Sequence, residues 1–299
     1  MNTSGETGGR WFAALQCLLP QHLLSRLVGA LARTRLAWVR RPLVAGFVRA
    51  YRPELSDAVE PDPRAYPSFN AFFTRPLRAG SRPASPAPRA IDSPVDGRIS
   101  ALGLSSAGRL LQAKGRDYSL RALLAGNEPL CASLAGGPYM TIYLAPFNYH
   151  RIHMALAGTL RGAWYVPGRL FSVNDATARH VPGLFARNER IVLQFDSPAG
   201  THALVMVGAL FVGSMGTVWH GDIAPRRARG ALALPVPTGS AASDLARGAE
   251  LGRFNMGSTV ILLLPPGPAR WDASLECGAT LRVGQTLGEL GARATAATS

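Results

Sequence analysis

The first fifty residues combine apolar positions at helical spacing with many arginines. After Pro20, which suits the first turn of a helix, one face of the predicted helix carries the apolar residues Leu23, Leu24, Leu27, Val28 and Leu31. Such a helix lies either in the headgroup region of a membrane or on the protein's own core, and this segment alone does not separate the two. The apolar run 11–19 is too short to cross a bilayer and lacks the cleavage site of a signal peptide.

The hydrophobic pattern changes twice further along the chain. Prolines limit regular structure over 52–89, so we predict a connecting arm, in which Phe69–Phe73 is a helical turn docked on the main domain. From residue 90 onward, short apolar runs alternate with glycine and proline turns. This texture predicts strands over 139–144, 190–195, 202–207, 210–212 and 260–264, a helix over 119–125, and a long surface loop over 225–249.

These elements predict an α+β fold in three parts. A basic amphipathic helical segment, 1–51, precedes the proline-rich arm, 52–89, and a β-rich, sandwich-like domain, 90–299. A chain of 299 residues can bury one substantial core. We therefore expect a single large domain with an N-terminal appendage.

The net charge and the cysteines limit the classes of ligand and the cellular compartment that we expect. The formal net charge of +14 comes almost entirely from arginine, because Lys114 is the only lysine. This excess favours nucleic acid, anionic lipid or acidic substrates without choosing among them. The cysteines Cys17, Cys131 and Cys277 are far apart and form no CxxC pair, so neither a zinc site nor a disulfide framework is indicated. Their odd number suits a reducing compartment such as the cytoplasm.

Two short segments carry titratable side chains that suit catalysis. Asp96 lies in Ser93–Gly97, which by itself predicts no more than a hairpin turn. His150 and His153 lie three residues apart, a spacing that can suit a metal. However, residues 144–160 contain no Asp or Glu and no third ligand follows at a known interval, so we expect no metal. Imidazole is the natural group for moving protons near neutral pH.

A third segment, Phe254–Thr259, places the peptide Gly257–Ser258 directly before a very apolar strand. In a strained turn, glycine permits unusual backbone angles and leaves its carbonyl open to attack by the hydroxyl that follows. Serine needs a base to act as a nucleophile, and Asp96, His153 and Ser258 supply the parts of a triad. The Gly-x-Ser-x-Gly elbow of the common hydrolase fold is absent.

Together, the three segments resemble the phosphatidylserine decarboxylase family of pyruvoyl-dependent, bacterial-type enzymes. In that family the Asp of Pro-x-Asp-Gly, the second His of Tyr-His-Arg-x-His and the Ser of Leu-Gly-Ser-Thr form a self-processing site. The resemblance runs from about Arg52 to the C-terminal region and includes Phe69–Phe73, Arg75–Arg78, Leu111–Gly115, Tyr165–Gly168, Leu170–Asn174, Leu184–Arg190 and Val207–Ala209. Two departures, Met256 for the commoner Leu and Ala155 for a frequent Pro, remove no reactive group.

The resemblance implies a catalytic domain that cuts itself between Gly257 and Ser258, giving a β chain, 1–257, and an α chain, 258–299. His153, oriented by Asp96, would take the proton of Ser258, whose oxygen attacks the Gly257 carbonyl. Ser258 would become a covalent pyruvoyl group, the only cofactor implied. That group would form a Schiff base with phosphatidylserine and accept the electrons left by carbon dioxide. His150 matches the family histidine that assists decarboxylation, by reprotonating the carbanion.

The implied product is phosphatidylethanolamine, and a lipid substrate favours the interfacial interpretation of segment 1–51. A basic amphipathic segment would hold the domain on an anionic membrane surface without crossing it. The expected location is the cytoplasmic face of the cell membrane, with peripheral attachment. Family members are often homodimers of processed pairs, so the resemblance extends to dimerisation.

Three other functions are compatible with parts of the sequence. A conventional serine hydrolase would use Asp96, His153 and Ser258 in an intact chain. A non-catalytic lipoyl-like β-sandwich module would need a modifiable lysine, but Lys114 lacks the Met-Lys or Asp-Lys context of such carriers. Nucleic-acid binding has the charge but no known module, so we expect no nucleic-acid partner.

Overall fold

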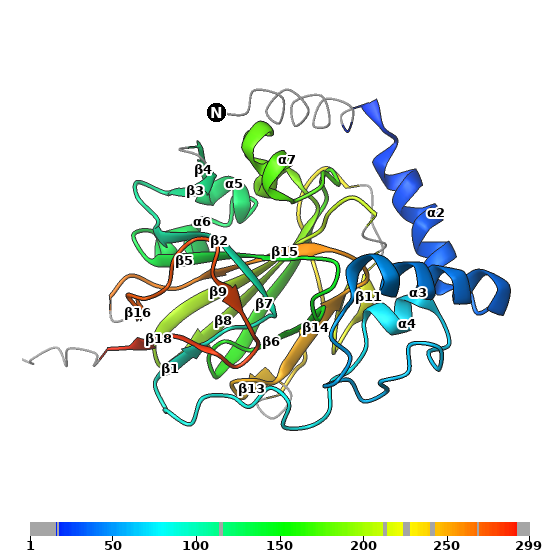
Figure 1. Cartoon of the computed structure of the whole chain (residues 1–299). Coiled ribbons are helices and arrows are strands. Elements are labelled where there is room, and N and C mark those ends of the chain that lie inside the picture. Colours follow the sequence, from blue (N-terminus) through cyan, green and yellow to red (C-terminus); the bar gives the residue numbers. More distant parts are fainter. Residues whose placement is uncertain are drawn as a thin grey trace, which may run out of the picture.

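An antiparallel sheet forms the centre of the molecule (Figure 1). The structure, a computed structural model, describes residues 16, 18–113, 116–211, 214–223, 228–239, 243–267 and 269–291. Within these residues nine strands pair in the order β12-β7-β8-β9-β15-β5-β2-β17, and β13 also pairs with β7. Their bounds are β2 Gly97–Leu104, β5 Pro138–Leu144, β7 Gly158–Val166, β8 Arg190–Ser197, β9 Gly200–Val207, β12 Leu232–Ala233, β13 Asp244–Leu245, β15 Ser258–Leu263 and β17 Thr280–Leu281.

Strand β15 lies between β9 and β5 and is buried along its whole length. Its apolar side chains are buried on both faces of the sheet, which explains why the sequence shows a continuous apolar run instead of an alternation. The register places Ser258 opposite Leu144 of β5, and Thr259 opposite Val207 of β9. Ser258 is therefore the first residue of a central strand.

Smaller sheets surround this one. A four-stranded sheet has the order β11-β10-β14-β6, a three-stranded sheet the order β1-β18-β16, and β3 pairs with β4. These strands are β1 Ala90–Asp92, β3 Arg109–Ala113, β4 Arg116–Ser119, β6 Arg151–His153, β10 Met215–Thr217, β11 Gly221–Ile223, β14 Glu250–Phe254, β16 Ala269–Trp271 and β18 Thr286–Leu290. The described helices are α2 Gln21–Arg33, α3 Ala37–Tyr51, α4 Phe69–Phe73, α5 Leu120–Leu123, α6 Glu128–Leu134, α7 Asp175–His180 and α8 Leu184–Arg187. The prediction of a β-rich α+β fold is confirmed.

Most predicted strands are present, with one error and two adjustments. The strands predicted over 139–144, 190–195, 202–207 and 260–264 correspond to β5, β8, β9 and β15. The strand predicted over 210–212 is wrong at Leu210 and Phe211, which form a turn in which Phe211 has a φ of 67°, and residue 212 lies outside the described residues. The helix predicted over 119–125 is limited to α5, where the Ser119 hydroxyl caps the first turn. The predicted loop 225–249 contains the short strands β12 and β13.

Helix α2 packs on the body through its small and polar side chains, Gln21, Ser25, Gly29 and Ala32. The Gln21 side chain accepts a 2.8 Å hydrogen bond from the backbone N–H of Leu170, and the Ser25 hydroxyl accepts one of 3.1 Å from that of Phe211. The opposite face is exposed: Leu23, Leu27 and Leu31 keep 56%, 59% and 46% of their surface accessible. The helix therefore does lie on the body of the protein, as one of the two alternatives held, but through its small and polar face, while three leucines of the predicted stripe stay exposed. None of the described helices has the length and apolar character required to span a membrane.

Helices α3 and α4 share a small aromatic core that includes part of the arm. Phe47 of α3 meets Phe69, Phe72 and Phe73 of α4 edge to face, with ring centroids 5.3, 5.8 and 5.9 Å apart. Phe72 and Phe73 are fully buried, so the helical turn predicted over Phe69–Phe73 does dock on the rest of the molecule. The Phe73 ring also contacts His150, at 4.1 Å between centroids. The arm thus reaches the candidate site.

Candidate active site

Backbone hydrogen bonds bring the three motif segments together. The N–H of His153, at the end of β6, donates to the carbonyl of Pro94 at 2.8 Å. The N–H of Phe254, at the end of β14, donates to the carbonyl of His150 at 3.0 Å. Ser258 follows after a short turn and pairs with Leu144, six residues before His150. Segments far apart in sequence therefore meet at one end of β15.

The carboxylate of Asp96 pairs with Arg82 instead of His153. Its two oxygens accept hydrogen bonds from Arg82 Nε at 3.2 Å and Nη2 at 2.9 Å, and Oδ1 also accepts from the backbone N–H of Val283 at 2.8 Å. Arg82 holds Asp57 as well, at 2.6 Å. The expectation that Asp96 directly orients His153 is wrong for this state, because the planar guanidinium fork satisfies both carboxylate oxygens.

His153 is positioned by a backbone carbonyl. Its Nδ1 lies 2.8 Å from the oxygen of Gly248, and its Nε2 lies 3.0 Å from the hydroxyl of Tyr149. Because a carbonyl can only accept, Nδ1 carries the proton and Nε2 presents its lone pair to the tyrosine. Burial lowers the pKa of His153, although the Gly248 carbonyl and the charges of Glu250 and Asp96 oppose this effect. His153 is therefore a neutral imidazole with a basic Nε2.

His150 is more deeply buried and has one unpaired nitrogen. Its Nδ1 donates to the backbone carbonyl of Asn148 at 2.8 Å, whereas its Nε2 is buried without a partner among the described residues. Burial lowers the pKa of His150 to about 3, despite the hydrogen bond to Asn148. An unpaired buried nitrogen is costly in a folded protein and often marks a functional site.

The turn before Ser258 is strained and firmly anchored. Met256 has a φ of 141°, a region that L-residues other than glycine rarely adopt. Asn255 fixes the turn: its backbone N–H donates to the Ser214 carbonyl at 3.0 Å, and its side chain donates to the Ser214 hydroxyl at 2.7 Å. Ser258 is fully buried, and its hydroxyl has no hydrogen-bond partner among the described residues. The nucleophilic oxygen is thus shielded from bulk water and uncommitted.

The unusual backbone angle is not at Gly257, contrary to expectation. It falls one residue earlier, at Met256, and Gly257 is not among the glycines of positive φ. A Cβ built on Gly257 would meet nothing within 4 Å. There is thus room for a side chain at position 257, and the strain is carried by its neighbour Met256.

Comparison with known proteins assigns the chain to a family. A family model described as phosphatidylserine decarboxylase matches residues 69–289, and a second one, described as PSD, matches residues 11–52. A protein named phosphatidylserine decarboxylase proenzyme from Ectopseudomonas mendocina is 49% identical over 279 residues, covering 93% of this chain and 98% of that protein. The protein of the same name from Methylococcus capsulatus is 47% identical over 277 residues, covering 93% and 96%. The chain belongs to the phosphatidylserine decarboxylase family.

Within this member of the phosphatidylserine decarboxylase family, the motif segments account for only part of the site. Arg82, Gly248 and Asn255 also determine how the candidate residues are held. Tyr149 and Asn255 could have been selected from the sequence, since they lie inside the quoted motifs, whereas Arg82 is one of several arginines in the arm. Among the described residues no cluster of three or more His, Cys, Asp or Glu side chains could hold a metal ion.

Proposed function

We propose that this chain is a phosphatidylserine decarboxylase precursor that cleaves itself between Gly257 and Ser258. The observation that carries the proposal is the buried, unpartnered hydroxyl of Ser258, at the start of a central strand and just after the strained turn at Met256. Family membership supports the same reaction. The processed pair of chains would convert phosphatidylserine into phosphatidylethanolamine and carbon dioxide.

In the first step, the Ser258 Oγ bonds to the carbonyl carbon of Gly257 while His153 Nε2 accepts the hydroxyl proton. The peptide C–N bond then breaks, and the nitrogen of residue 258 takes up that proton, which leaves an ester. The Tyr149 hydroxyl lies 3.0 Å from His153 Nε2, within hydrogen-bonding distance. For His153 to take the proton of Ser258, this hydroxyl must either turn away or relay the proton. Asp96 acts through its charge, which raises the pKa of His153, rather than through a hydrogen bond.

In the second step, loss of the α-proton of residue 258 expels the Gly257 carboxylate. Water then replaces the nitrogen of residue 258, which leaves as ammonia, and a pyruvoyl group remains at the new N-terminus. The buried hydroxyl of Ser258 fits this conversion, because it is the atom that forms the ester and has no competing partner among the described residues. Once formed, the pyruvoyl group supplies a carbonyl that acts as an electron sink for decarboxylation.

His150 fits the decarboxylation half of the reaction. Its low pKa keeps the ring neutral in the precursor, with an unpaired Nε2 that is a weak base. To reprotonate the substrate carbon it must first become protonated, and an anionic substrate beside the ring would raise its pKa in that direction. We therefore assign His150 to the processed enzyme and His153 to the cleavage.

The exposed leucine face of α2 supports peripheral attachment to a membrane, which we place at the cytoplasmic face of the cell membrane by resemblance to the family. Leu23, Leu27 and Leu31 point away from the body, and Trp38 at the start of α3 is 77% exposed. Apolar burial at the interface and attraction of the arginines to anionic lipid add together in such segments. This attachment would bring the site to its lipid substrate.

The intact mass of the denatured, purified chain tests the cleavage. We expect two chains that separate after Gly257, with a blocked, pyruvoyl N-terminus on the chain that begins at residue 258. Ser258→Ala should give one full-length chain, whereas Ser133→Ala, on the surface of α6, should be cleaved as the wild type is. A folded wild-type chain that stays intact overturns the proposal. If that intact chain also reacts with a serine-directed fluorophosphonate, the serine hydrolase alternative replaces it.

A further inference from the structure

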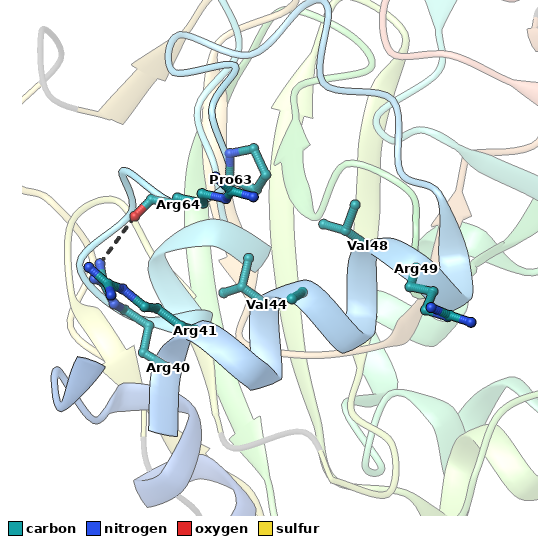
Figure 2. A pocket seen from close by; sticks show the side chains of 8 residues that line it. Arg40, Arg41, Val44, Val48, Arg49, Pro63 and Arg64 are labelled. Atoms are coloured by element: carbon teal, nitrogen blue, oxygen red, sulfur yellow. Dashed lines mark hydrogen bonds between the residues drawn. The ribbon is translucent and has the colours of Figure 1, made fainter. Parts of the chain in front are cut away.

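A cavity of about 600 Å³ lies between helix α3 and the arm (Figure 2). None of the motif segments of the candidate active site lines it. Its walls carry Arg40 and Arg41 toward one end of α3, Arg49 toward the other and Arg64 from the arm, with Val44 and Val48 between them. The volume is within the range of small-molecule sites, which is roughly 300–1,000 Å³. No described lining residue is acidic.

The positive charge of this cavity is not neutralised by neighbouring side chains. Arg41, Arg49 and Arg64 are exposed, and none of these guanidinium groups has an ion pair or hydrogen bond within the part of the chain that the structure describes. Asp62, close by in sequence, caps the backbone N–H of Arg64 at 2.9 Å. In contrast, Arg82 and Arg151 each pair with a carboxylate at 2.9 Å.

Arg40 joins the two walls of this cavity. Its Nη1 donates to the backbone carbonyls of Arg64 and Tyr66, which fixes the guanidinium between α3 and the arm. Its Nε is buried and has no partner among the described residues. Three uncompensated arginines around one cavity predict an anionic ligand with several acceptor oxygens.

We propose that this cavity binds the phosphate of an anionic glycerophospholipid, at a site separate from the active site. Arginine forks suit phosphate oxygens, and the apolar lining between them, Ala45 and Val48, offers surface for the first carbons of the acyl chains. A free phosphate ion has no apolar part that would contact this apolar lining. A lipid bound there would contact both the arm and α3. Helix α3 packs on Phe73 of α4, and the Phe73 ring contacts His150.

Titration of the full-length protein with short-chain phosphatidylglycerol, kept below its micelle concentration, tests the proposal without a membrane surface. Isothermal calorimetry should show saturable binding. Arg41→Gln/Arg49→Gln should weaken it about tenfold or more, since charge-assisted hydrogen bonds are lost. Ala45→Phe, which adds volume at the cavity wall and removes no charge, should also weaken it.

The matched control is Arg26→Gln/Arg35→Gln. Both arginines are exposed on the same N-terminal segment, lie outside the cavity lining, and their replacement removes the same two charges. This control should bind within about twofold of the wild type, because exposed charges outside a site contribute little. Cleavage after Gly257, measured by mass, reports whether each variant has folded and tests the proposed function independently.

Three results would overturn the proposal. Equal losses for the two double variants would mean diffuse attraction to charge. Inorganic phosphate or glycerol phosphate that displaces the lipid at equal concentration would mean a soluble phosphate site. No measurable binding of short-chain phosphatidylglycerol to a folded, cleaved wild-type protein would mean that the cavity does not bind this lipid.

Discussion

The two histidines of the candidate site are held in the same tautomer. In each ring Nδ1 donates to a backbone carbonyl, that of Asn148 for His150 and that of Gly248 for His153. Burial lowers both pKa values below the ordinary histidine value near 6.5, so both rings stay neutral to lower pH than a free imidazole does. The fold thus favours the neutral form of both rings, with Nε2 as the nitrogen that can accept a proton.

This arrangement predicts how self-cleavage depends on pH. A base acts only while deprotonated, and the pKa of His153 is below its ordinary value because of burial. Cleavage should therefore continue below about pH 6.5 and slow only as His153 becomes protonated at lower pH. Time courses of a cell-free translation product, transferred to a series of buffers, would measure this. A rate that already halves at or above the ordinary histidine pKa would contradict it.

Substitutions at the Asp96–Arg82 pair should move that pH profile in opposite directions. The charge of Asp96 raises the pKa of His153, so Asp96→Asn should lower it and shift the acid limb to lower pH, with a slower maximal rate. Arg82→Gln leaves the carboxylate charge uncompensated, so it should raise the pKa of His153 and shift the limb to higher pH. Thermal unfolding would check that both variants fold. Shifts of the same sign would show that the pair has only a structural role.

At the scale of elements, the turn at Met256 joins two parts of the fold. Its side chain packs against the α3–α4 aromatic core, while its backbone takes a φ of 141° just before the bond to be cut. A backbone held in such a region stores about 1–3 kcal/mol, provided that the surroundings enforce it. The anchored Asn255 and the packed Met256 side chain supply that enforcement.

We expect Met256→Gly to slow self-cleavage roughly fivefold or more, because glycine adopts this φ without strain. Met256→Leu should cleave like the wild type, since leucine retains both the strain and the packing. Pulse labelling in cells, followed by separation of the two chains on gels, would compare the rates. Faster cleavage in the glycine variant would indicate that the strain at Met256 does not promote the reaction.

Helix α2 yields a prediction about membrane binding. Replacing Leu23, Leu27 and Leu31 together by Gln should weaken binding to vesicles of phosphatidylcholine and phosphatidylglycerol by about tenfold or more, because apolar surface no longer enters the interface. The melting temperature should hardly change, since all three side chains are exposed. Leu104→Gln, at an exposed position of β2, is the control. Equal binding by the triple variant and the control would exclude α2 as the docking surface.

The elements differ in how far sequence could predict them. Continuous apolar runs predicted β5, β8, β9 and β15 well, because a strand that is buried on both faces needs apolar side chains at nearly every position. The hydrophobic pattern could not predict which face of α2 is buried. Its buried face is small and polar: Gly29 and Ala32 are buried, and Gln21 and Ser25 accept hydrogen bonds from backbone N–H groups, so this face has no periodic apolar signal. Likewise, the motifs predicted that Asp96 and His153 would meet, but not that Arg82 would bind the carboxylate, because arm pairing is long-range.

At the scale of the whole molecule, cleavage after Gly257 would cut the chain just before its central strand. The resulting α chain begins with β15, which pairs with β5 on one side and β9 on the other. Further along, β17 pairs with β2 and β18 pairs with β1. Every one of these partner strands belongs to the β chain. The central sheet and the three-stranded sheet are therefore each assembled from strands of both products.

The two chains should consequently stay together after processing. Release of the α chain would expose Val260, Ile261, Leu262 and Leu263, each at most 2% accessible, at a cost of about 1.5–3 kcal/mol for each side chain. It would also break the ladders that β15 forms with both neighbours. We expect native mass spectrometry and gel filtration to give a species that contains both chains, which separate only in denaturant. An α chain that elutes alone under native conditions would show that this strand arrangement does not persist in the processed enzyme.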